Sequence, residues 1–171
     1  GYTNPIGWFT FPKVVPAFPE KEMDMLIQEA KLTGFLGNKH ASGEDIIKEY
    51  GEAHLDNGYP IIYTSADSVV QIAAHEQGFG LNNLYETCKI ASEIFNDLGV
   101  QRIIARPFLG GNKEDFFRTK NRKDFISPPP IHTLCDKVIK SGKKCFGIGK
   151  IADIFGHRGI SKSISGMSDD K

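Results

Sequence analysis

The chain has 171 residues, a mass of 18.9 kDa, 21 basic and 21 acidic side chains, and therefore no formal net charge. This length suits a single domain, and a composition of 40% hydrophobic and 25% charged residues excludes a disordered segment, because it supplies enough apolar surface for a core. The balanced charge argues against a dedicated nucleic-acid-binding protein, and no apolar run is long enough to span a membrane, so we expect a soluble cytoplasmic protein.

The first 19 residues combine aromatic side chains with four prolines and show neither helical nor strand periodicity. We therefore expect residues 1–18 to form an extended lead-in. A first helix is predicted to begin at Pro19, because proline suits the first turn of a helix. Met23 and Leu26 lie on its apolar face, and Gly34 marks the limit of the pattern.

A second helix is predicted to begin at Ser42, whose hydroxyl can cap the backbone while Asp45 completes a capping-box pattern. Gly51 and the Asn57-Gly58 pair indicate its end. The preceding stretch GNKHASG (37–43) lacks the GK[ST] ending of a phosphate-binding loop, so we expect a tight turn that leads into the cap.

The middle of the chain alternates between β-prone and helical patterns. A strand is predicted over 61–65, and a strand or short helix over 69–74. The clearest helical pattern covers 81–98, and Asn82 or Asn83 can supply its cap. A strand over 102–109, a Gly-Gly-Asn turn and a returning strand around 116–119 together predict a hairpin.

The last part of the chain predicts a helix after the three prolines at 128–130, a strand over 145–148 and a short helix over 151–155. From Gly156 onward the composition indicates a mobile tail or a linker. Helices and strands without strict alternation predict an α/β fold with α+β character, in which helices flank a mixed β-sheet.

Three other patterns in the sequence do not indicate a functional site. The five histidines are scattered without metal-ligand spacing, so no metal site is expected. The three cysteines are widely spaced and flanked by apolar residues, which favours reduced, mostly buried thiols over a disulfide framework. The GIGKIA stretch (147–152) is similar to part of a dinucleotide-binding fingerprint, but too few residues follow it for the second strand of such a fold.

The neutral total charge hides an uneven distribution, since residues 1–60 carry 5 basic and 9 acidic side chains and residues 61–171 carry 16 and 12. Alternation along the strand predicted over 102–109 places Arg102, Ile104 and Arg106 on one face and leaves residues 103, 105 and 107 for the core. Arg118, on the returning strand, would join these guanidinium groups in a fork that matches phosphate oxygens. A solvated basic strand face is the alternative.

A second candidate group follows the strand predicted over 61–65. Ser65, Asp67 and Val69 alternate there, and the ends of strands commonly present ligand-binding groups in α/β proteins. Together with the arginines they predict a pocket for a small phosphorylated polyol, with Ser65 and Asp67 at the hydroxyls and Val69 and Ile104 as an apolar wall. No nucleophile, general base or metal site accompanies this pocket, so the residues predict binding without a catalytic centre.

Two alternatives belong to other functional classes. One is a non-catalytic protein that binds sugar phosphates by itself. The other is an RNA-binding module in which the phenylalanines of the basic hairpin stack on bases. Those phenylalanines are Phe108, Phe116, Phe117 and Phe125.

Six ordered blocks carry a family resemblance. They are GNKHASGEDII (37–47), IIYTSADSVVQIAAHE (61–76), LYETCKIA (84–91), RIIARPFLG (102–110), FFRTKNRKDF (116–125) and GIGKIADIF (147–155). In this order they resemble the phosphopentomutase family of the alkaline phosphatase superfamily, specifically its cap domain. The likeness extends from about residue 11 to residue 163.

The resemblance implies a cap inserted into an enzyme that interconverts ribose 1-phosphate and ribose 5-phosphate, or the deoxy sugars. In that family a phosphorylated threonine acts beside two manganese ions, and a sugar bisphosphate is the expected activator. The threonine and the metal ligands belong to core segments on either side of the cap. No catalytic residue and no metal ligand is therefore predicted in this chain, which is expected to be inactive by itself.

The resemblance also implies site residues, boundaries and partners. The substrate-binding positions that match the family are Ser65, Asp67, Val69, Arg102, Ile104 and Arg118, and Arg106 has a less specific match. The expected organisation is a lead-in from the missing core (1–18), a cap (19–158) and a tail back to the core (159–171). The expected partners are a pentose phosphate and the missing core domain, with no nucleic acid and no membrane.

Overall fold

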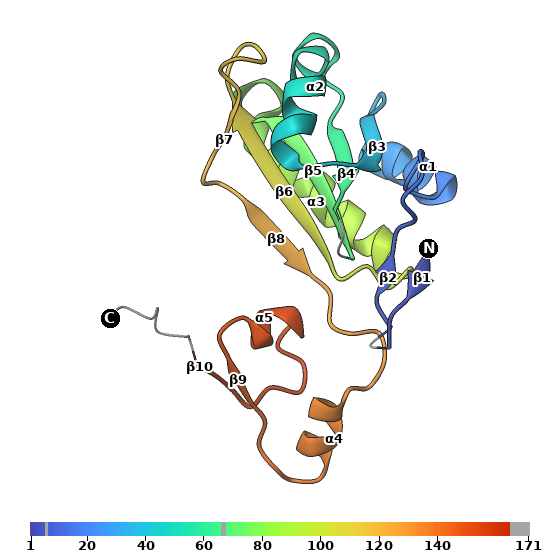
Figure 1. Ribbon diagram of the computed structural model, residues 1–171, viewed down its shortest axis with the longest axis vertical. Helices are drawn as coiled ribbons and strands as arrows, with labels where there is room; N and C mark the ends of the chain where they lie inside the picture. Colours follow the sequence, from blue (N-terminus) through green and yellow to red (C-terminus); the bar gives the residue numbers. More distant parts are fainter. Residues whose placement is uncertain (6, 66–67, 165–171) are drawn as a thin grey trace.

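A six-stranded mixed β-sheet forms the centre of the larger part of the molecule (Figure 1). The computed structural model describes residues 1–5, 7–65 and 68–164. In spatial order the strands are β3 (Leu36–His40), β4 (Ile61–Thr64), β5 (Val69–His75), β6 (Arg102–Leu109) and β7 (Phe117–Arg118), and β8 (Lys123–Ile126) also pairs with β6. The β3/β4 and β5/β6 pairs are parallel and the others are antiparallel, which confirms the predicted mixed sheet and the predicted hairpin.

Two helices, α1 (Glu20–Glu29) and α3 (Leu81–Asn96), cover one face of this sheet and enclose the main core. The helix predicted after Pro19 is confirmed, with Met23 and Leu26 buried, although it ends before the expected limit at Gly34. Alternate side chains of the central strands point into the same core. They include Ile62, Val70, Ile72, Ala74, Ile103 and Ala105.

The start of α3 differs from the prediction. The helix follows a single π-helical turn, η1 (Glu76–Gly80), and its N-cap is Gly80, which makes no side-chain capping bond. Asn82 and Asn83 lie inside the helix, so the prediction that one of them caps it was wrong. The φ of Gly80 is 91°, and this left-handed conformation redirects the chain from the turn into α3.

In the described part of the chain, one helix packs on the opposite face of the sheet, α2 (Gly43–Asn57). Ser42 caps it as predicted, because its Oγ accepts a hydrogen bond from the Asp45 N–H at 3.2 Å. Gly58 ends it in a left-handed conformation. Gly51, expected near the end, instead lies buried within the helix, where a Cβ would approach the ring of Phe116 to 2.4 Å.

Residues 37–40 of the stretch that was expected to be a tight turn belong to strand β3, which pairs in parallel with β4. The prediction failed because the strand is irregular, with a register shift between Gly37 and Lys39. Gly37 has a φ of 90°, and a Cβ there would lie 2.6 Å from the carbonyl oxygen of Ile62. Where two strand backbones come this close, glycine replaces the β-branched or aromatic residues that usually identify a strand. The sequence of β3 therefore shows no β-prone pattern.

The N-terminal segment, predicted as an extended lead-in, also contributes a hairpin and core side chains to the fold. β1 (Tyr2–Thr3) and β2 (Phe9–Thr10) form a small antiparallel hairpin. Phe11 and Phe18 are buried in the main core, with their ring centroids 4.7 Å apart. Burial of aromatic rings, which has no periodic signature, holds this segment against the sheet.

Residues 131–164 form a smaller part, which lies below the sheet in Figure 1 and which we call the C-terminal unit. It contains α4 (Leu134–Lys140), β9 (Phe146–Ile148), α5 (Ile151–Ile154) and β10 (Lys162–Ile164). β10 pairs in parallel with β9, so the prediction of a mobile tail was wrong for residues 162–164. None of the helices in the described parts of the chain is both long enough and apolar enough to cross a bilayer.

Candidate functional site

On the sheet face that carries α2, this helix packs mainly on β3, β4 and β5, and its isoleucines share a core with Phe108 near the end of β6. Strand register arranges the side chains of this face in rows, and Tyr63, Val69, Gln71 and Ile104 are buried there. Tyr63, Gln71, Ile104 and Asp124 face one another across four strands, and Val69 lies opposite Arg102 in the next row. We call this surface the basic face. Its members are Tyr63, Val69, Gln71, Arg102, Ile104, Arg106, Arg118, Arg122 and Asp124.

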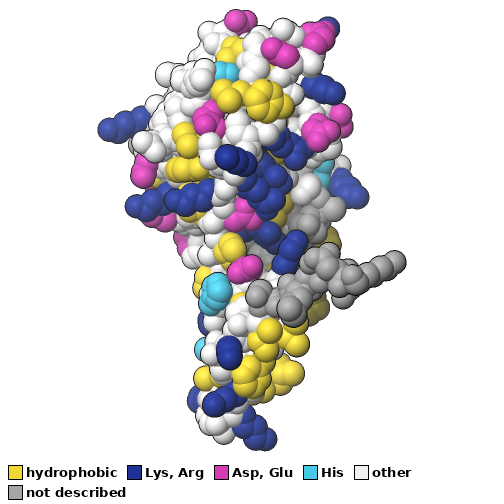
Figure 2. All heavy atoms as spheres, turned by 90° about the vertical axis from the view of Figure 1, so that its left-hand side faces the viewer, with side chains coloured by type: hydrophobic (Ala, Val, Ile, Leu, Met, Phe, Trp, Pro, Cys, Tyr) yellow, Lys and Arg dark blue, Asp and Glu magenta, His cyan; other side chains and the backbone are white. Residues whose placement is uncertain are grey.

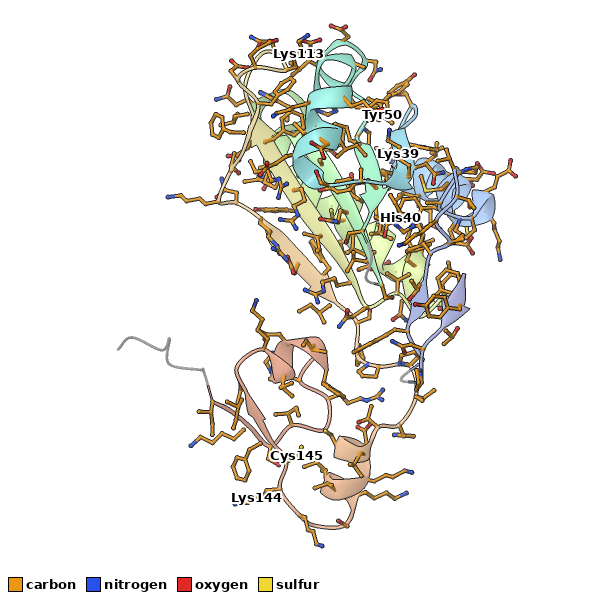
Figure 3. All side chains as sticks on the ribbon, in the orientation of Figure 1. Lys39, His40, Tyr50, Lys113, Lys144 and Cys145 are labelled. Carbon is orange, nitrogen blue, oxygen red and sulfur yellow. The ribbon has the colours of Figure 1, made fainter. Side chains whose placement is uncertain are left out.

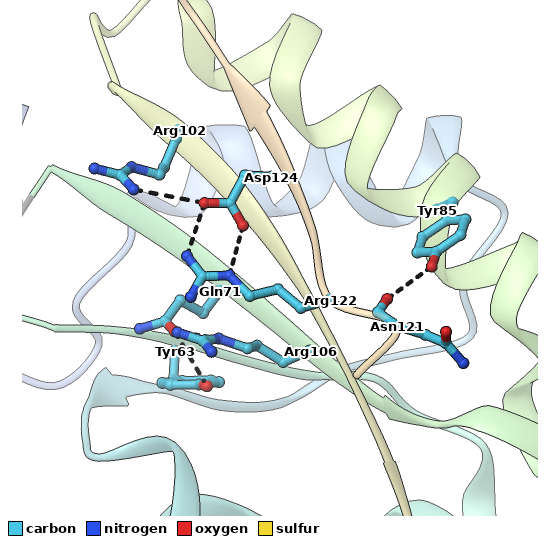
Figure 4. Close-up of polar contacts among 8 residues, drawn as sticks. All are labelled: Tyr63, Gln71, Tyr85, Arg102, Arg106, Asn121, Arg122 and Asp124. Carbon is cyan, nitrogen blue, oxygen red and sulfur yellow. Dashed lines mark hydrogen bonds and ion pairs between the residues drawn. The ribbon is translucent and has the colours of Figure 1, made fainter. Parts of the chain in front are cut away.

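One carboxylate organises two of the arginines on the basic face. Asp124 accepts two hydrogen bonds from Arg122, from Nε at 2.6 Å and from a terminal nitrogen at 2.7 Å, and forms a longer ion pair with Arg102 at 3.5 Å (Figure 4). The Nε of Arg102 is buried and has no hydrogen-bond partner among the described residues. Two guanidinium groups therefore share a single carboxylate and retain donor capacity for an anion.

The loop between β7 and β8 positions Arg122 for this contact. Asn121, next to it, accepts a hydrogen bond from the Tyr85 hydroxyl at its carbonyl (2.7 Å) and donates one from its side chain to Glu76 (2.8 Å). The ammonium group of Lys123 lies over the ring of Tyr85, 4.9 Å from its centroid. Asn121 and Lys123 thus contact η1 and α3, on the side of the sheet that holds the main core. Arg122, which lies between them in the sequence, points to the other side and reaches Asp124 on the basic face.

The centre of the basic face is a polar network around Gln71. Its Oε1 accepts hydrogen bonds from the Nε of Arg106 at 3.0 Å and from the hydroxyl of Tyr63 at 3.3 Å (Figure 4). Burial lowers the pKa of Arg106, and the nearby charges of Arg122 and Arg118 lower it further. Like charges have thus been brought together on a partly buried surface, an arrangement that a bound anion would stabilise.

Arg118 occupies the opposite end of the basic face from Arg102. It lies across from Phe108 on β6, six residues beyond Arg102, which corresponds to about 20 Å along the strand. Arg102, Arg106 and Arg118 therefore do not form the single fork that we expected, but a track with Arg106 in the middle. Figure 2 shows Lys and Arg side chains gathered across the middle of the molecule on this side.

The end of the track at Arg118 meets the first turn of α2. A terminal nitrogen of Arg118 lies 3.9 Å from the Glu44 carboxylate, too far for a strong ion pair. A Cβ on Gly43 would lie 2.9 Å from the Arg118 guanidinium and 2.5 Å from the Tyr63 hydroxyl. Glycine at position 43 thus allows the helix start, the phenol and the guanidinium to approach one another.

The end of the track at Arg102 opens into a cavity of about 490 Å³ between the sheet and α5. This size falls within the range of small-molecule sites in proteins. Its lining combines five charged groups of both signs with two apolar side chains. The lining residues are Arg102, Arg122, Asp124, Ile126, Lys150, Asp153 and Ile154.

Several of the predicted site residues meet here. Val69 and Arg102 are paired in register, Ile104 is buried beside them, and Ser65 is half-buried directly after β4. Thr64 shapes this end of the strand, since its hydroxyl donates to the carbonyl of Val69 at 2.7 Å. Asp67 lies outside the described residues. The predicted core positions Ile103 and Ala105 face the main core, which confirms the alternation along β6.

Sequence reasoning missed four residues of the basic face, namely Tyr63, Gln71, Arg122 and Asp124. Tyr63 and Gln71 lie within apolar runs that were interpreted only as buried strands. Arg122 and Asp124 alternate in the NRKDF segment, and this alternation was an available signal for a further strand. Within residues 1–5, 7–65 and 68–164, no group of three or more His, Cys, Asp or Glu side chains is placed to hold a metal ion.

Asp124 gives the site a testable pH dependence. Burial by itself would raise the pKa of this carboxyl, but the hydrogen bond from Arg122 and the charges of Arg122 and Arg102 outweigh burial and lower the pKa. A lowered pKa contributes stability above the unfolded-state pKa of about 3.9, and this contribution is lost as the pH falls through the folded-state pKa. We expect the unfolding free energy of Asp124→Asn, measured by urea titration, to depend less steeply on pH in this acidic range. Identical slopes for the two proteins would contradict this role.

Comparison of the sequence with known proteins finds relatives that share one name. No protein-family model matches the chain. It is 50% identical over 155 residues to a phosphopentomutase of Pseudoalteromonas translucida, an alignment that covers 91% of this chain and 38% of that protein. Phosphopentomutases of Chelativorans sp. and Methylorubrum extorquens are 49% and 52% identical over 162 and 158 residues, or 40% and 39% of their lengths. The chain thus spans about two fifths of the length of these curated relatives.

Proposed function

The chain is homologous to one segment of the phosphopentomutases, and from this premise we propose that it is the substrate-handling cap of such an enzyme. The proposed task is to bind the sugar phosphate while ribose 1-phosphate and ribose 5-phosphate, or the deoxy sugars, are interconverted. The observation that carries the proposal is the basic face, where four arginines gather beside apolar side chains and only two of them, Arg102 and Arg122, pair with Asp124. Arginine is well suited to phosphate because its planar fork donates two hydrogen bonds at once.

In this proposal the two kinds of side chain on the basic face have separate roles. The arginines bind the phosphate, and the positive track draws the substrate to this face of the sheet. Val69 and Ile104 pack against the sugar, and Ser65 and Asp67 bind its hydroxyl groups. Arg122 and Asp124 join this set because they determine where the Arg102 guanidinium lies.

The reaction itself belongs to the missing part of the protein. A core domain is proposed to supply the threonine that carries the phosphoryl group and the two manganese ions, with a sugar bisphosphate as activator. The described residues of this chain offer no ligand set for those ions, so no step is assigned to a metal here. A cap contributes to rate when its contacts with the reacting state are stronger than its contacts with the free substrate.

The C-terminal unit is where we propose that the core attaches. It exposes several large apolar side chains that a water-soluble domain would normally cover. The most exposed are Leu134 at 76%, Ile148 at 65% and Phe146 at 53%, and Figure 2 shows apolar side chains gathered on the lower part of the molecule. In this proposal the six-stranded sheet with its helices binds the sugar phosphate, and the C-terminal unit, most of which the resemblance assigns to the cap (19–158), contacts the core.

A direct binding measurement tests the proposed function. We expect ribose 5-phosphate, titrated into the 15N-labelled protein, to shift the backbone and arginine Nε–H resonances of Arg102, Arg106 and Arg118. Ribose without phosphate should cause much smaller shifts, because the charge-assisted hydrogen bonds are absent. Shifts confined to residues away from the basic face, or equal shifts with ribose, would overturn the proposal.

The RNA-binding alternative has less support from the fold. Phe108 is fully buried, and Phe116 and Phe125 are half-buried by packing. Of the four phenylalanines, only Phe117 is exposed, at 58%. One free ring provides no platform for successive bases, so single-stranded RNA is expected to bind only weakly and to dissociate as salt is added.

A further inference from the structure

Two cysteines of the C-terminal unit lie in contact, although they are ten residues apart in the sequence and separated by a lysine-rich loop. Cys135 is in the first turn of α4, and Cys145 directly precedes β9. Their Sγ atoms lie 3.4 Å apart, and both side chains are half-buried. Figure 3 places Cys145 beside Lys144 in this unit. The sequence suggested isolated, mostly buried thiols, and among the three cysteines only Cys88 fits that description.

The fold holds both cysteines against one short segment, residues 159–161. The N–H of Cys145 donates to the hydroxyl of Ser161 at 3.0 Å, and the N–H of Ser161 donates to the carbonyl of Cys145 at 2.7 Å. Cys135 packs on the backbone of Gly159, where an added Cβ would lie 2.9 Å from the Cys135 Cβ. The proximity of the sulfurs therefore follows from backbone contacts and not from a chance rotamer.

We propose that Cys135 and Cys145 form a reversible intramolecular disulfide by exchange with a low-molecular-weight disulfide of the glutathione class. The thiolate of one cysteine attacks the external disulfide, forms a mixed disulfide and releases one glutathione thiol. The second cysteine then attacks its neighbour and releases the second glutathione. Two protein thiols are oxidised to one disulfide, and one external disulfide is reduced to two thiols, which take up the two protons.

Little movement is needed for the second step. The sulfurs must shorten their separation from 3.4 Å to the S–S bond length of about 2.05 Å, which small side-chain rotations can supply. Burial, the interaction with the Cys145 thiol and the nearby Asp136 carboxylate raise the pKa of Cys135. Because exchange requires the thiolate, closure of the bond should become faster as the pH rises.

The bond would act in a weakly packed part of the molecule. α4 contains no buried residue, and β9 has only Gly147 buried between two exposed side chains. A cross-link between them closes the loop 136–144 and ties the two elements together without reliance on a core. The proposal thus predicts that the C-terminal unit is more rigid when the two cysteines are oxidised than when they are reduced. The basic face should not change.

The test is a disulfide map of the protein after incubation with oxidised glutathione. Digestion with trypsin without reduction should yield the peptides 124–137 and 145–150 joined by one disulfide. The number of free thiols measured under denaturing conditions should fall from three to one, and reduced glutathione should restore it. Amide hydrogen exchange in α4 and β9 should slow at least several-fold in the oxidised form and stay unchanged in the sheet.

Three variants make the outcome decisive. Cys135→Ser and Cys145→Ser should each stop at a persistent mixed disulfide with glutathione on the remaining partner and show no slowing of exchange. Cys88→Ala, a change in the main core, should still give the linked peptides. Stable mixed disulfides on both cysteines of the wild-type protein, a link to Cys88, or disulfide-linked dimers in place of the internal bond would each overturn the proposal.

Discussion

Replacement of Phe18 by alanine is expected to lower the free energy of unfolding by about 3–5 kcal/mol, the usual cost of removing a large aromatic side chain from a core. Phe18 is 1% exposed and packs edge-to-face on Phe11 and Phe95, with centroid distances of 4.7 and 5.9 Å. Its backbone N–H also donates to the side chain of Asn38 on β3 at 2.7 Å. Urea unfolding of the variant measures the loss.

Val15→Ala is the matched control, because Val15 belongs to the same N-terminal segment but is 75% exposed. We expect this change to alter stability by less than about 0.5 kcal/mol, as is usual for exposed positions. Equal effects at the two positions, or a negligible effect of Phe18→Ala, would mean that residues 1–18 are only a connection to the rest of the protein and not a part of this core.

The second large effect is expected at Arg118 in the full-length enzyme of which this chain is proposed to be a part. Arg118→Ala should lower kcat/KM by tenfold or more, since a lost charge-assisted hydrogen bond to phosphate is worth about 1.5–3 kcal/mol. The weak 3.9 Å contact with Glu44 leaves the guanidinium available to a ligand. Steady-state kinetics with ribose 1-phosphate, compared between the variant and the wild type, measure the effect.

Lys120→Ala provides the control for charge alone, because Lys120 is an exposed cation close to Arg118 in the sequence. If Arg118 acts only through its positive charge, the two variants should lose similar amounts of kcat/KM. If Arg118 contacts the phosphate directly, Arg118→Ala should lose much more kcat/KM than Lys120→Ala. Unchanged kinetics of Arg118→Ala would remove this residue from the proposed site and leave Arg102 and Arg106 as the candidates for the phosphate.

Regular elements with a local signal could be predicted from the sequence. The cap of α2 at Ser42, the strand at 102–109 and the helix at 81–96 each follow from contacts between residues close in the chain. Elements without such a signal were missed. β3 requires a glycine beside the carbonyl of Ile62, and the N-terminal segment is fixed by aromatic rings that meet only in the folded core.

The candidate site divides in the same way. Alternation along one strand was sufficient to put Arg102, Ile104 and Arg106 on one face, because side chains of a strand point to alternate sides whatever the partners are. The positions of Arg122 and Asp124 were not predictable, since they depend on β8 crossing back onto β6. The separation of Arg118 from Arg102 likewise follows from the register of β7.

By itself, then, the sequence determined the neutral net charge and the excess of basic side chains in residues 61–171. It also determined the mixed fold class and which arginines face one side of β6, because both follow from patterns within short stretches of the chain. Only the tertiary structure decided that these arginines form a track around Gln71 and Asp124, that residues 131–164 form a separate unit, and that Cys135 and Cys145 meet. The physical reason is that strand pairing and burial bring together residues far apart in the chain, and no pattern within a short window records which of them will meet.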